Sequence, residues 1–184
     1  MGSSKALLDL NGLTFLQTIL DKIERLELLS CVTVGHGADK VLANHDLSDV
    51  ITARNSEMSA GPIGSIRASI KALEEYDIEA LVVWPVDFPH VEEGTVAKLL
   101  REKDQKSRSG IIVPDYQGRG GHPAIFDSAL FQELLAAPND VGARAVVRKD
   151  PNRVKRVPVN DPAVVDCINT PQAYQALLSR VSSS

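Results

Sequence analysis

Apolar positions along the chain follow two patterns that alternate from end to end. Short apolar runs predict buried strands over residues 31–34, 49–53, 80–84, 110–113 and 154–159. Between them, apolar residues recur at helical spacing, and Thr14 is placed to cap the first helix. The predicted helices cover residues 15–26, 38–44, 63–76, 96–103, 128–136, 143–148 and 171–181. Strands separated by helices favour right-handed crossovers, and therefore an α/β fold with a mostly parallel sheet.

The informative polar residues lie just after predicted strands. In parallel α/β sheets, ligands bind outside the carboxyl ends of the strands. Asn55 follows the second predicted strand, and Asp87 follows the strand over residues 80–84. His122 lies in the glycine-rich segment 118–123, whose composition is typical of a loop. A ligand site is therefore expected at this edge of the sheet.

Length and composition fit a single globular domain. The 184 residues are 43% hydrophobic and 24% charged, so we expect one domain over residues 1–181 and a disordered tail at 182–184. The net charge of −4 argues against a nucleic-acid-binding protein. Cys31 and Cys167 are too few for a disulfide framework or a zinc site. Since no membrane span and no signal peptide is evident, we expect a cytoplasmic protein.

Asp87 stands between two prolines, in the segment Pro85-Val86-Asp87-Phe88-Pro89. Proline fixes φ and stiffens the turn, so this carboxylate is held in place. A rigid carboxylate at a strand end suits Mg²⁺, which takes a few carboxylates together with phosphate oxygens. The alternative is that Asp87 merely caps the turn, and this segment alone does not decide between the two.

The segment from Asn55 to Gly61 leads into the helix start that contains Ser65. Amide groups at a helix N-terminus favour a phosphate, and an Asn side chain offers both a donor and an acceptor to a nucleotide. The simpler interpretation is a helix capped by its own serine. Lys5 follows Gly2 and two serines, a weak pattern for a phosphate contact that a frayed terminus explains equally well.

His122 and Arg144 are further candidates, each with an ordinary alternative. A loop histidine is more often a surface residue than a ligand contact. Arg144 lies in a first helical turn, where it would clamp a phosphate or pair with a local acid. Neither residue points to a function when it is taken alone.

Taken together, these segments resemble the molybdenum-cofactor cytidylyl- and guanylyltransferases, a family of MobA-like nucleotidyltransferases. Residues 1–8 match that family's Arg-Met-Gly-x-x-Lys signature from its Met onward, and residues 11–12 match the turn that follows. Residues 55–66 resemble its Asn–Gly–Ser-Leu block. Residues 85–89 resemble its Pro-x-Asp-x-Pro metal motif.

The resemblance continues through the second half of the chain. Residues 121–123 and 142–144 resemble Gly-His-Pro and Gly-Ala-Arg motifs that are more typical of the cytidylyl branch. Residues 169–174 resemble the closing Asn-Thr-Pro block. Several motifs in the same order are far more specific than any one of them, so the chain is identified as a member of this family.

The resemblance implies a three-layer, Rossmann-like nucleotidyltransferase fold. It implies that a phosphate of a molybdopterin-type acceptor attacks the α-phosphate of CTP or GTP, with Mg²⁺ as cofactor and the cytidylyl branch favoured. The implied catalytic residues are Lys5 and Asp87, and Asp87 is the metal ligand. The implied nucleotide-binding residues are Gly2, Lys5, Asn55, Gly61, Ser65 and Asp87. The implied acceptor-binding residues are Gly121, His122, Pro123, Arg144 and Asn169.

The sequence departs from the family pattern in two places. It begins inside the signature, so we expect the first strand, its glycine loop and the signature Arg to be missing from these 184 residues, NTP binding to be weak, and catalysis to be weak or absent. Either the start was assigned too late or the chain is a degenerate relative of the family. The sheet should then have an exposed slot that either drives self-association, with a homodimer as one outcome, or is filled by residues 5–10. Asn169 and Cys167 stand where acids are common in the family, which puts a two-ligand metal site in doubt.

Two alternative functions stay open. One is a sugar- or alditol-phosphate nucleotidyltransferase on the same fold. The other is a non-catalytic binding or maturation partner of a molybdenum enzyme, which the expected loss of the glycine loop favours.

Overall fold

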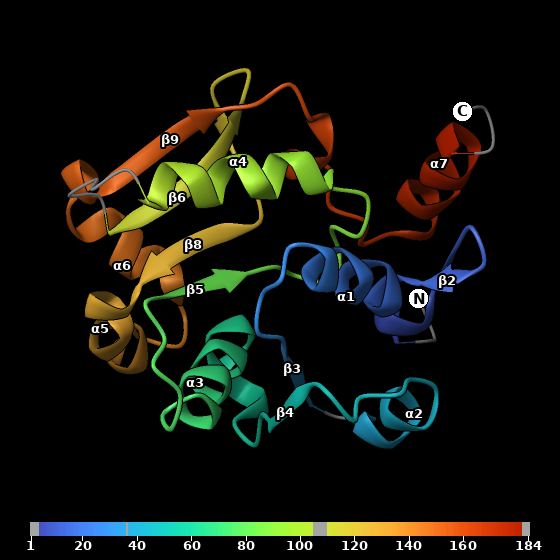
Figure 1. Ribbon diagram of the computed structural model, residues 1–184, viewed down its shortest axis with the longest axis horizontal. Coiled ribbons are helices and arrows are strands. Elements are labelled where there is room, and N and C mark those ends of the chain that lie inside the picture. Colours follow the sequence, from blue (N-terminus) through green and yellow to red (C-terminus); the bar gives the residue numbers. More distant parts are fainter. Residues whose placement is uncertain (1–3, 36, 105–109, 182–184) are drawn as a thin grey trace.

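A computed structural model describes residues 4–35, 37–104 and 110–181. Figure 1 shows a larger sheet flanked by helices and, beside it, a smaller two-stranded sheet. The predicted tail at 182–184 and the site candidate Gly2 lie outside the described residues. The described part of the chain contains no helix that is both long and apolar enough to cross a membrane.

The smaller sheet pairs β3 (Cys31–Val34) with β4 (Ile51–Arg54) in parallel, with Cys31 opposite Ile51. The helices α1 (Phe15–Arg25) and α2 (Ala38–Ala43) share one apolar cluster with β3. Thr14 caps α1 as predicted, because its hydroxyl accepts a hydrogen bond from the Gln17 amide at 3.0 Å. The helix α3 (Pro62–Ala72) packs on β3 and β4 as well.

The larger sheet has the strand order β5-β8-β6-β7, with β9 paired to β6. Only β6 and β9 run parallel, whereas β5–β8, β8–β6 and β6–β7 are antiparallel. The strands are β5 (Ala80–Val83), β6 (Ile111–Tyr116), β7 (Arg119–Gly120), β8 (Ala124–Asp127) and β9 (Val154–Pro158). The α/β class is confirmed, but the prediction of one mostly parallel sheet is wrong: the sheets are mixed and split.

The error arises between residues 111 and 127. We predicted a glycine-rich loop over residues 118–123, but β6 continues to Tyr116 and turns back into β7 through Gln117 and Gly118. Both turn residues have positive φ, 52° and 80°, as a tight two-residue hairpin turn requires. The short strand β8 then follows directly and brings antiparallel pairing into the middle of the sheet.

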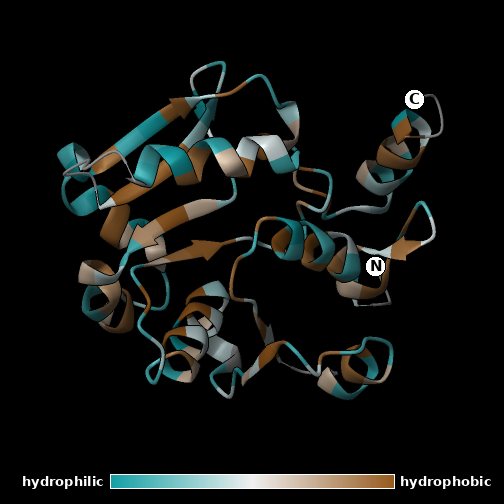
Figure 2. Cartoon of the chain, viewed as in Figure 1, coloured by the Kyte–Doolittle hydropathy of each residue, from teal (hydrophilic) through white to brown (hydrophobic). Residues whose placement is uncertain are grey.

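Helices cover both faces of the larger sheet. Adjacent strand residues point to opposite faces, so Ile111 belongs to the cluster under α3 and α5, and Ile112 to the cluster under α4. Figure 2 shows the apolar colouring concentrated on β5 and β6 between these helices. The remaining helices are α4 (Glu93–Asp104), α5 (Phe131–Ala136), α6 (Ala143–Lys149) and α7 (Pro171–Val181).

The first and last described segments lie against each other. A hairpin of β1 (Asp9–Leu10) and β2 (Leu13–Thr14) precedes α1, and α7 packs against it. The Tyr174 hydroxyl donates a hydrogen bond to the Asp9 carbonyl at 2.8 Å, and its ring meets Phe15 edge-on at 5.8 Å between centroids. Tyr174 thereby ties α7 to the β1–β2 hairpin and to the start of α1.

The two sheets are not joined by hydrogen bonds between β3 and β5 in the described residues. There, β3 pairs with β4, and β5 pairs with β8. The expectation that residues 5–10 fill a slot in the sheet is wrong, because Lys5–Leu7 forms a 3-10 turn and Asp9–Leu10 pairs with β2.

Candidate functional site

Asp87 lies in a firmly held turn directly after β5. The Phe88 amide closes the turn on the Pro85 carbonyl at 3.1 Å, and the Trp84 indole donates to the Phe88 carbonyl at 2.9 Å. The Asp87 carbonyl accepts a hydrogen bond from the Ile168 amide at 2.9 Å. The backbone is thus fixed from both sides, which matches the predicted rigid strand-end carboxylate.

Two side chains from distant segments meet the Asp87 carboxylate. The Lys5 ammonium lies 3.0 Å from its Oδ2 atom, and the Cys167 thiol donates to the same atom at 3.7 Å. The side chains of Lys5 and Asp87 are 31% and 24% exposed, so a ligand can reach both. Burial and the nearby carboxylate raise the pKa of the Cys167 thiol, which keeps it protonated.

His122 contacts the same turn through the Phe88 ring. Its ring lies 5.0 Å from the Phe88 ring, centroid to centroid, and its amide donates to the Val164 carbonyl at 2.8 Å. The buried Nδ1 atom has no hydrogen-bond partner among the described residues. This buried nitrogen, on a ring that contacts Phe88, is a polar group available to a ligand.

Gly121 makes this arrangement possible because no side chain fits there. A Cβ atom at this position would lie 2.1 Å from the Val164 carbonyl oxygen, inside van der Waals contact. The Gly121 amide also donates to the Pro114 carbonyl at 3.0 Å. The segment therefore approaches the 3-10 turn η5 (Pro162–Val165) backbone to backbone.

Gly121→Ala should destabilise the protein by about 1–3 kcal/mol, the usual cost of forcing an extra carbon into a packed site. The backbone must shift, which also weakens the His122–Val164 hydrogen bond. Gly94→Ala in α4 is the matched control, since a Cβ there meets nothing within 4 Å and alanine favours a helix. Urea unfolding curves measure both variants, and equal midpoints for Gly121→Ala and the wild type would contradict this account.

The protonation of His122 links the site to stability at acidic pH. Burial and, next, the Arg144 charge lower the pKa of His122 from its ordinary 6.5, while Asp87 opposes the shift. Below about pH 6.5 the unfolded chain gains a proton at this position that the folded protein resists. The free energy of unfolding should therefore fall as the pH drops from about 6.5 to the lowered folded pKa.

His122→Gln should remove this part of the pH dependence. Urea unfolding at pH 7.5 and pH 5.5 gives the loss of stability for each protein. The loss of unfolding free energy between the two pH values should be smaller in the variant. It should not vanish, because burial also lowers the pKa of His90, and both proteins retain His90. An identical loss in the two proteins would show that His122 does not carry a lowered pKa.

Asn55 and Ser65 form the second part of the site, at the end of β4. The side-chain Nδ2 of Asn55 donates to the Ser65 hydroxyl at 3.3 Å. The side-chain Oδ1 of Asn55 accepts a hydrogen bond from the backbone amide of Glu57 at 2.9 Å. Gly64 leaves room for this packing, because a Cβ there would lie 2.9 Å from the Asn55 side chain. Gly61, with φ of 62°, turns the chain into α3 as its N-cap.

A cavity lies at the end of β3, beside Lys5. It has a volume of about 200 Å³ and is lined by Lys5, by Val34 and Gly35 after β3, and by Val86 beside Asp87. The backbone amide of Asn55 donates to the backbone carbonyl of Val34 at 2.8 Å, so Asn55 lies next to the end of β3. The structure therefore places Lys5 and the end of β3 around one cavity, and Asp87 lies next to it as the partner of Lys5.

The remaining acceptor-side candidates are placed differently. Pro123 is buried, and Arg144 lies in the first turn of α6, exposed and close enough to influence His122. Asn169 is exposed, and its backbone amide donates to the backbone carbonyl of Cys167 at 3.0 Å. Asp166, next to Cys167, turns away to His90 and Arg180, at 3.2 and 2.5 Å.

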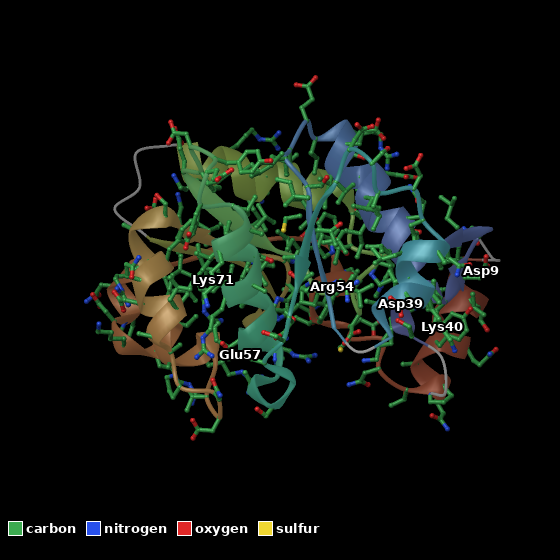
Figure 3. The ribbon with its side chains drawn as sticks, turned by 90° about the horizontal axis from the view of Figure 1, so that it is seen from below. Asp9, Asp39, Lys40, Arg54, Glu57 and Lys71 are labelled. Atoms are coloured by element: carbon green, nitrogen blue, oxygen red, sulfur yellow. The ribbon has the colours of Figure 1, made fainter. Side chains whose placement is uncertain are left out.

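Sequence reasoning missed several contributions to the site. Lys22 on α1 donates to the carbonyls of Pro89 and Val91, each at 2.7 Å, and so ties α1 to the chain after Asp87. Arg54, the residue before Asn55, is exposed and lies 4.0 Å from Asp39; Figure 3 labels Arg54 and Asp39. Lys22 lies in an amphipathic helix and Arg54 is the last residue of a strand. Charged residues are common at such positions, so the sequence pattern does not single out either residue.

The donor set around Asp87 suits a cation that is shared with bound phosphates. The described residues contain no cluster of three or more His, Cys, Asp or Glu that could hold a metal ion. Mg²⁺ in nucleotide sites takes one or two carboxylates together with phosphate oxygens and water. Asp87 supplies one such carboxylate at an accessible position, which fits this mode and not a metal held by protein ligands alone.

Comparison with known proteins gives one family and a consistent fold. Residues 1–156 match the model of the MobA-like NTP transferase domain. The crystal structure of Rv0371c from Mycobacterium tuberculosis H37Rv is 26% identical, with a TM-score of 0.81 over 97% of this chain and 91% of that one. The complex of Rv0371c with manganese is 24% identical, with a TM-score of 0.81 over 95% and 91%.

A more distant match is molybdopterin-guanine dinucleotide biosynthesis protein A from Archaeoglobus fulgidus. It is 19% identical, with a TM-score of 0.73 over all of this chain and 93% of that one, which shows a shared fold. No curated protein matches the chain.

Proposed function

The chain belongs to the family of MobA-like NTP transferase domains, and from this premise we propose that it transfers a nucleoside monophosphate from CTP or GTP to a molybdopterin-type phosphate acceptor. The observation that carries the proposal is the pairing of Lys5 with Asp87 on a rigid turn at the carboxyl end of β5. A cation and a carboxylate at such an edge suit a nucleoside triphosphate with its metal ion.

The reaction needs positioning and charge neutralisation more than covalent chemistry. An oxygen of the acceptor's terminal phosphate forms a bond to the α-phosphorus of the NTP. The bond from the α-phosphorus to the oxygen that bridges to the β-phosphate breaks, and pyrophosphate leaves with the electron pair. The product is a nucleotide joined to the acceptor through a pyrophosphate linkage.

Lys5 and Asp87 have complementary roles in this reaction. They neutralise each other in the structure, and a bound triphosphate with its cation would exchange that ion pair for two new contacts. Lys5 would then contact the phosphates and Asp87 the cation. A divalent ion held there, most simply Mg²⁺, supplies positive charge to the triphosphate. The manganese complex of Rv0371c supports a divalent ion at a site of this fold.

The nucleoside and the acceptor would occupy opposite sides of this centre. Asn55 and Ser65, held together at 3.3 Å, would contact the nucleoside, with Gly61 shaping the turn beside them. On the acceptor side, the open Nδ1 of His122 would donate or accept a hydrogen bond, and Arg144 would attract a phosphate. Gly121, Pro123 and Asn169 would shape this side.

Acceptor-dependent release of pyrophosphate tests the proposal. The protein is incubated with Mg²⁺, one of the four common NTPs and either molybdopterin or a sugar phosphate, and pyrophosphate is measured. We expect release with CTP or GTP in the presence of molybdopterin. Release with a sugar phosphate alone would overturn the acceptor assignment. No release with any pair, from protein that still binds Mg²⁺·NTP, would favour a non-catalytic binding protein.

A further inference from the structure

Lys22 on α1 places a charged group against the chain that follows Asp87. Its ammonium donates to the carbonyls of Pro89 and Val91, each at 2.7 Å. Partial burial lowers the pKa of Lys22 from its ordinary 10.5. In Figure 1 the chain that leaves β5 runs to this helix. Hydrogen bonds from a charged donor are roughly twice as strong as neutral ones, so this segment is firmly fixed to α1.

Asp161 binds the same segment through an amide. This carboxylate is 3% exposed, and its Oδ2 atom accepts hydrogen bonds from the Glu92 amide at 2.8 Å and from the Thr95 hydroxyl at 3.0 Å. The Asp161 charge opposes the lowering of the Lys22 pKa more strongly than any other group does, so the two charges interact. Residues 89–92 are therefore held by a cation that binds carbonyls and by an anion that binds an amide.

The other end of α1 is joined to the segment that carries Lys5. The Phe15 amide, in the first turn of α1, donates to the Leu8 carbonyl at 2.8 Å. Ala6 packs against the apolar cluster that contains Leu16 of the same helix. One helix therefore contacts the Lys5 segment at its first turn and the chain after β5 at its last turn.

We propose that Lys22 is a positioning residue, which sets the approach of Lys5 to Asp87 by fixing the Asp87 turn to the helix that carries the Lys5 segment. Lys5 and Asp87 lie 82 positions apart in the chain and meet at 3.0 Å. A small shift of either segment would separate them, and Lys22 prevents that shift through the backbone without acting on the reacting atoms. The inference rests on the proposed function in one respect, namely that this pair receives the Mg²⁺·NTP.

Trp84 reports on the turn without any nucleotide. It is the one tryptophan of the sequence, and its indole N–H donates to the Phe88 carbonyl, next to Asp87, at 2.9 Å. Exchange of this indole proton with water, followed by NMR, therefore measures how often the turn opens. In Lys22→Met the exchange should be at least about tenfold faster than in the wild type, because two hydrogen bonds to a charged group are lost.

Nucleotide affinity connects the turn to the site. In a calorimetric titration, Lys22→Met should bind Mg²⁺·NTP at least about tenfold more weakly than the wild type, since a misplacement of about 1 Å far from the chemistry can cost about 100-fold. Arg25→Gln is the control for charge, because it removes a cation from the same turn of α1 and breaks the 2.6 Å contact of Arg25 with Glu93. Exchange and affinity should both stay at wild-type values in this variant.

A second control separates positioning from a general loss of stability. Leu134 is fully buried in the apolar cluster on the opposite face of the sheet from Phe88. Leu134→Ala therefore lowers the thermal midpoint by opening a cavity away from the turn, and its nucleotide affinity should equal that of the wild type. If Lys22→Met does not fold, Lys22→Gln, which is also neutral but keeps a polar group, is measured instead with the same expected direction.

Three results would overturn the inference. The first is wild-type indole exchange in a folded Lys22 variant. The second is faster exchange with unchanged nucleotide affinity, because the turn would then open without disturbing the site. The third is an equal effect of Lys22→Met and of either control on both measurements, which would leave Lys22 a purely structural residue. A wild-type protein that binds no Mg²⁺·NTP would instead overturn the proposed function, and the indole exchange would still decide whether Lys22 holds the turn.

Discussion

Asp87→Asn should lower the affinity for Mg²⁺·NTP by more than about 100-fold, beyond the 10–100-fold that outer-shell partners of a metal typically cost. The amide keeps the shape of the side chain but removes the negative charge that would hold the cation. The fold should remain intact, because the Asp87 carbonyl that binds the Ile168 amide belongs to the backbone. Isothermal calorimetry with Mg²⁺·CTP and Mg²⁺·GTP measures the change.

Asp166→Asn is the matched control for this substitution. It removes a carboxylate one residue from Cys167, but one that pairs with His90 and Arg180 instead of facing the site. Nucleotide affinity should be unchanged in this variant, whereas some stability is lost. Equal nucleotide affinity in Asp87→Asn and the wild type would remove Asp87 from the cation site.

Lys5→Gln should weaken NTP binding by roughly 10- to 150-fold, the range that corresponds to losing one hydrogen bond to a charged group. Lys5 lines the cavity at the end of β3, and its ammonium pairs with Asp87, which is where the phosphates would lie. The loss should be smaller for the nucleoside monophosphate, which offers fewer phosphate oxygens. That dependence on phosphate number separates a phosphate contact from a general loss of folding.

Lys71→Gln removes the same charge far from the proposed phosphates. Lys71 is exposed in the last turn of α3, whose first turn holds Ser65, and Figure 3 labels it on that helix. Fluorescence titration with a labelled nucleotide should give wild-type affinity for this variant. If Lys5→Gln and Lys71→Gln weaken binding equally, the effect comes from net charge and Lys5 has no specific role.

Local sequence patterns predicted most of the helices and the strands β3, β4, β5, β6 and β9, because apolar spacing and capping residues act within a few positions. Thr14 stands at the helix start that its chemistry predicts. The strand direction was not predictable in this way. The four residues of β8 follow Pro123 without a turn of their own, and only pairing with β5 and β6 makes them a strand. The family resemblance drawn from the motifs is confirmed.

The sequence predicted those features of the site that lie within a single short segment, but not the contacts between distant segments. The placement of Asp87 after a buried strand follows from the sequence, since two prolines and an apolar run lie side by side. Its contacts with Lys5 and Cys167 join residues 82 and 80 positions apart, and no local pattern encodes such a distance. The same holds for the backbone approach of Gly121 to Val164, which only the folded sheet reveals.

The central claim is that this centre transfers the α-phosphate group of a nucleotide together with its nucleoside. The most direct measurement follows radioactive phosphorus from CTP or GTP, labelled in separate reactions at the α or the γ position, into the molybdopterin acceptor. The account predicts that α label enters the acceptor product and that γ label leaves as pyrophosphate. Transfer of γ label to the acceptor, or release of γ label as orthophosphate without any α label in the product, would contradict it.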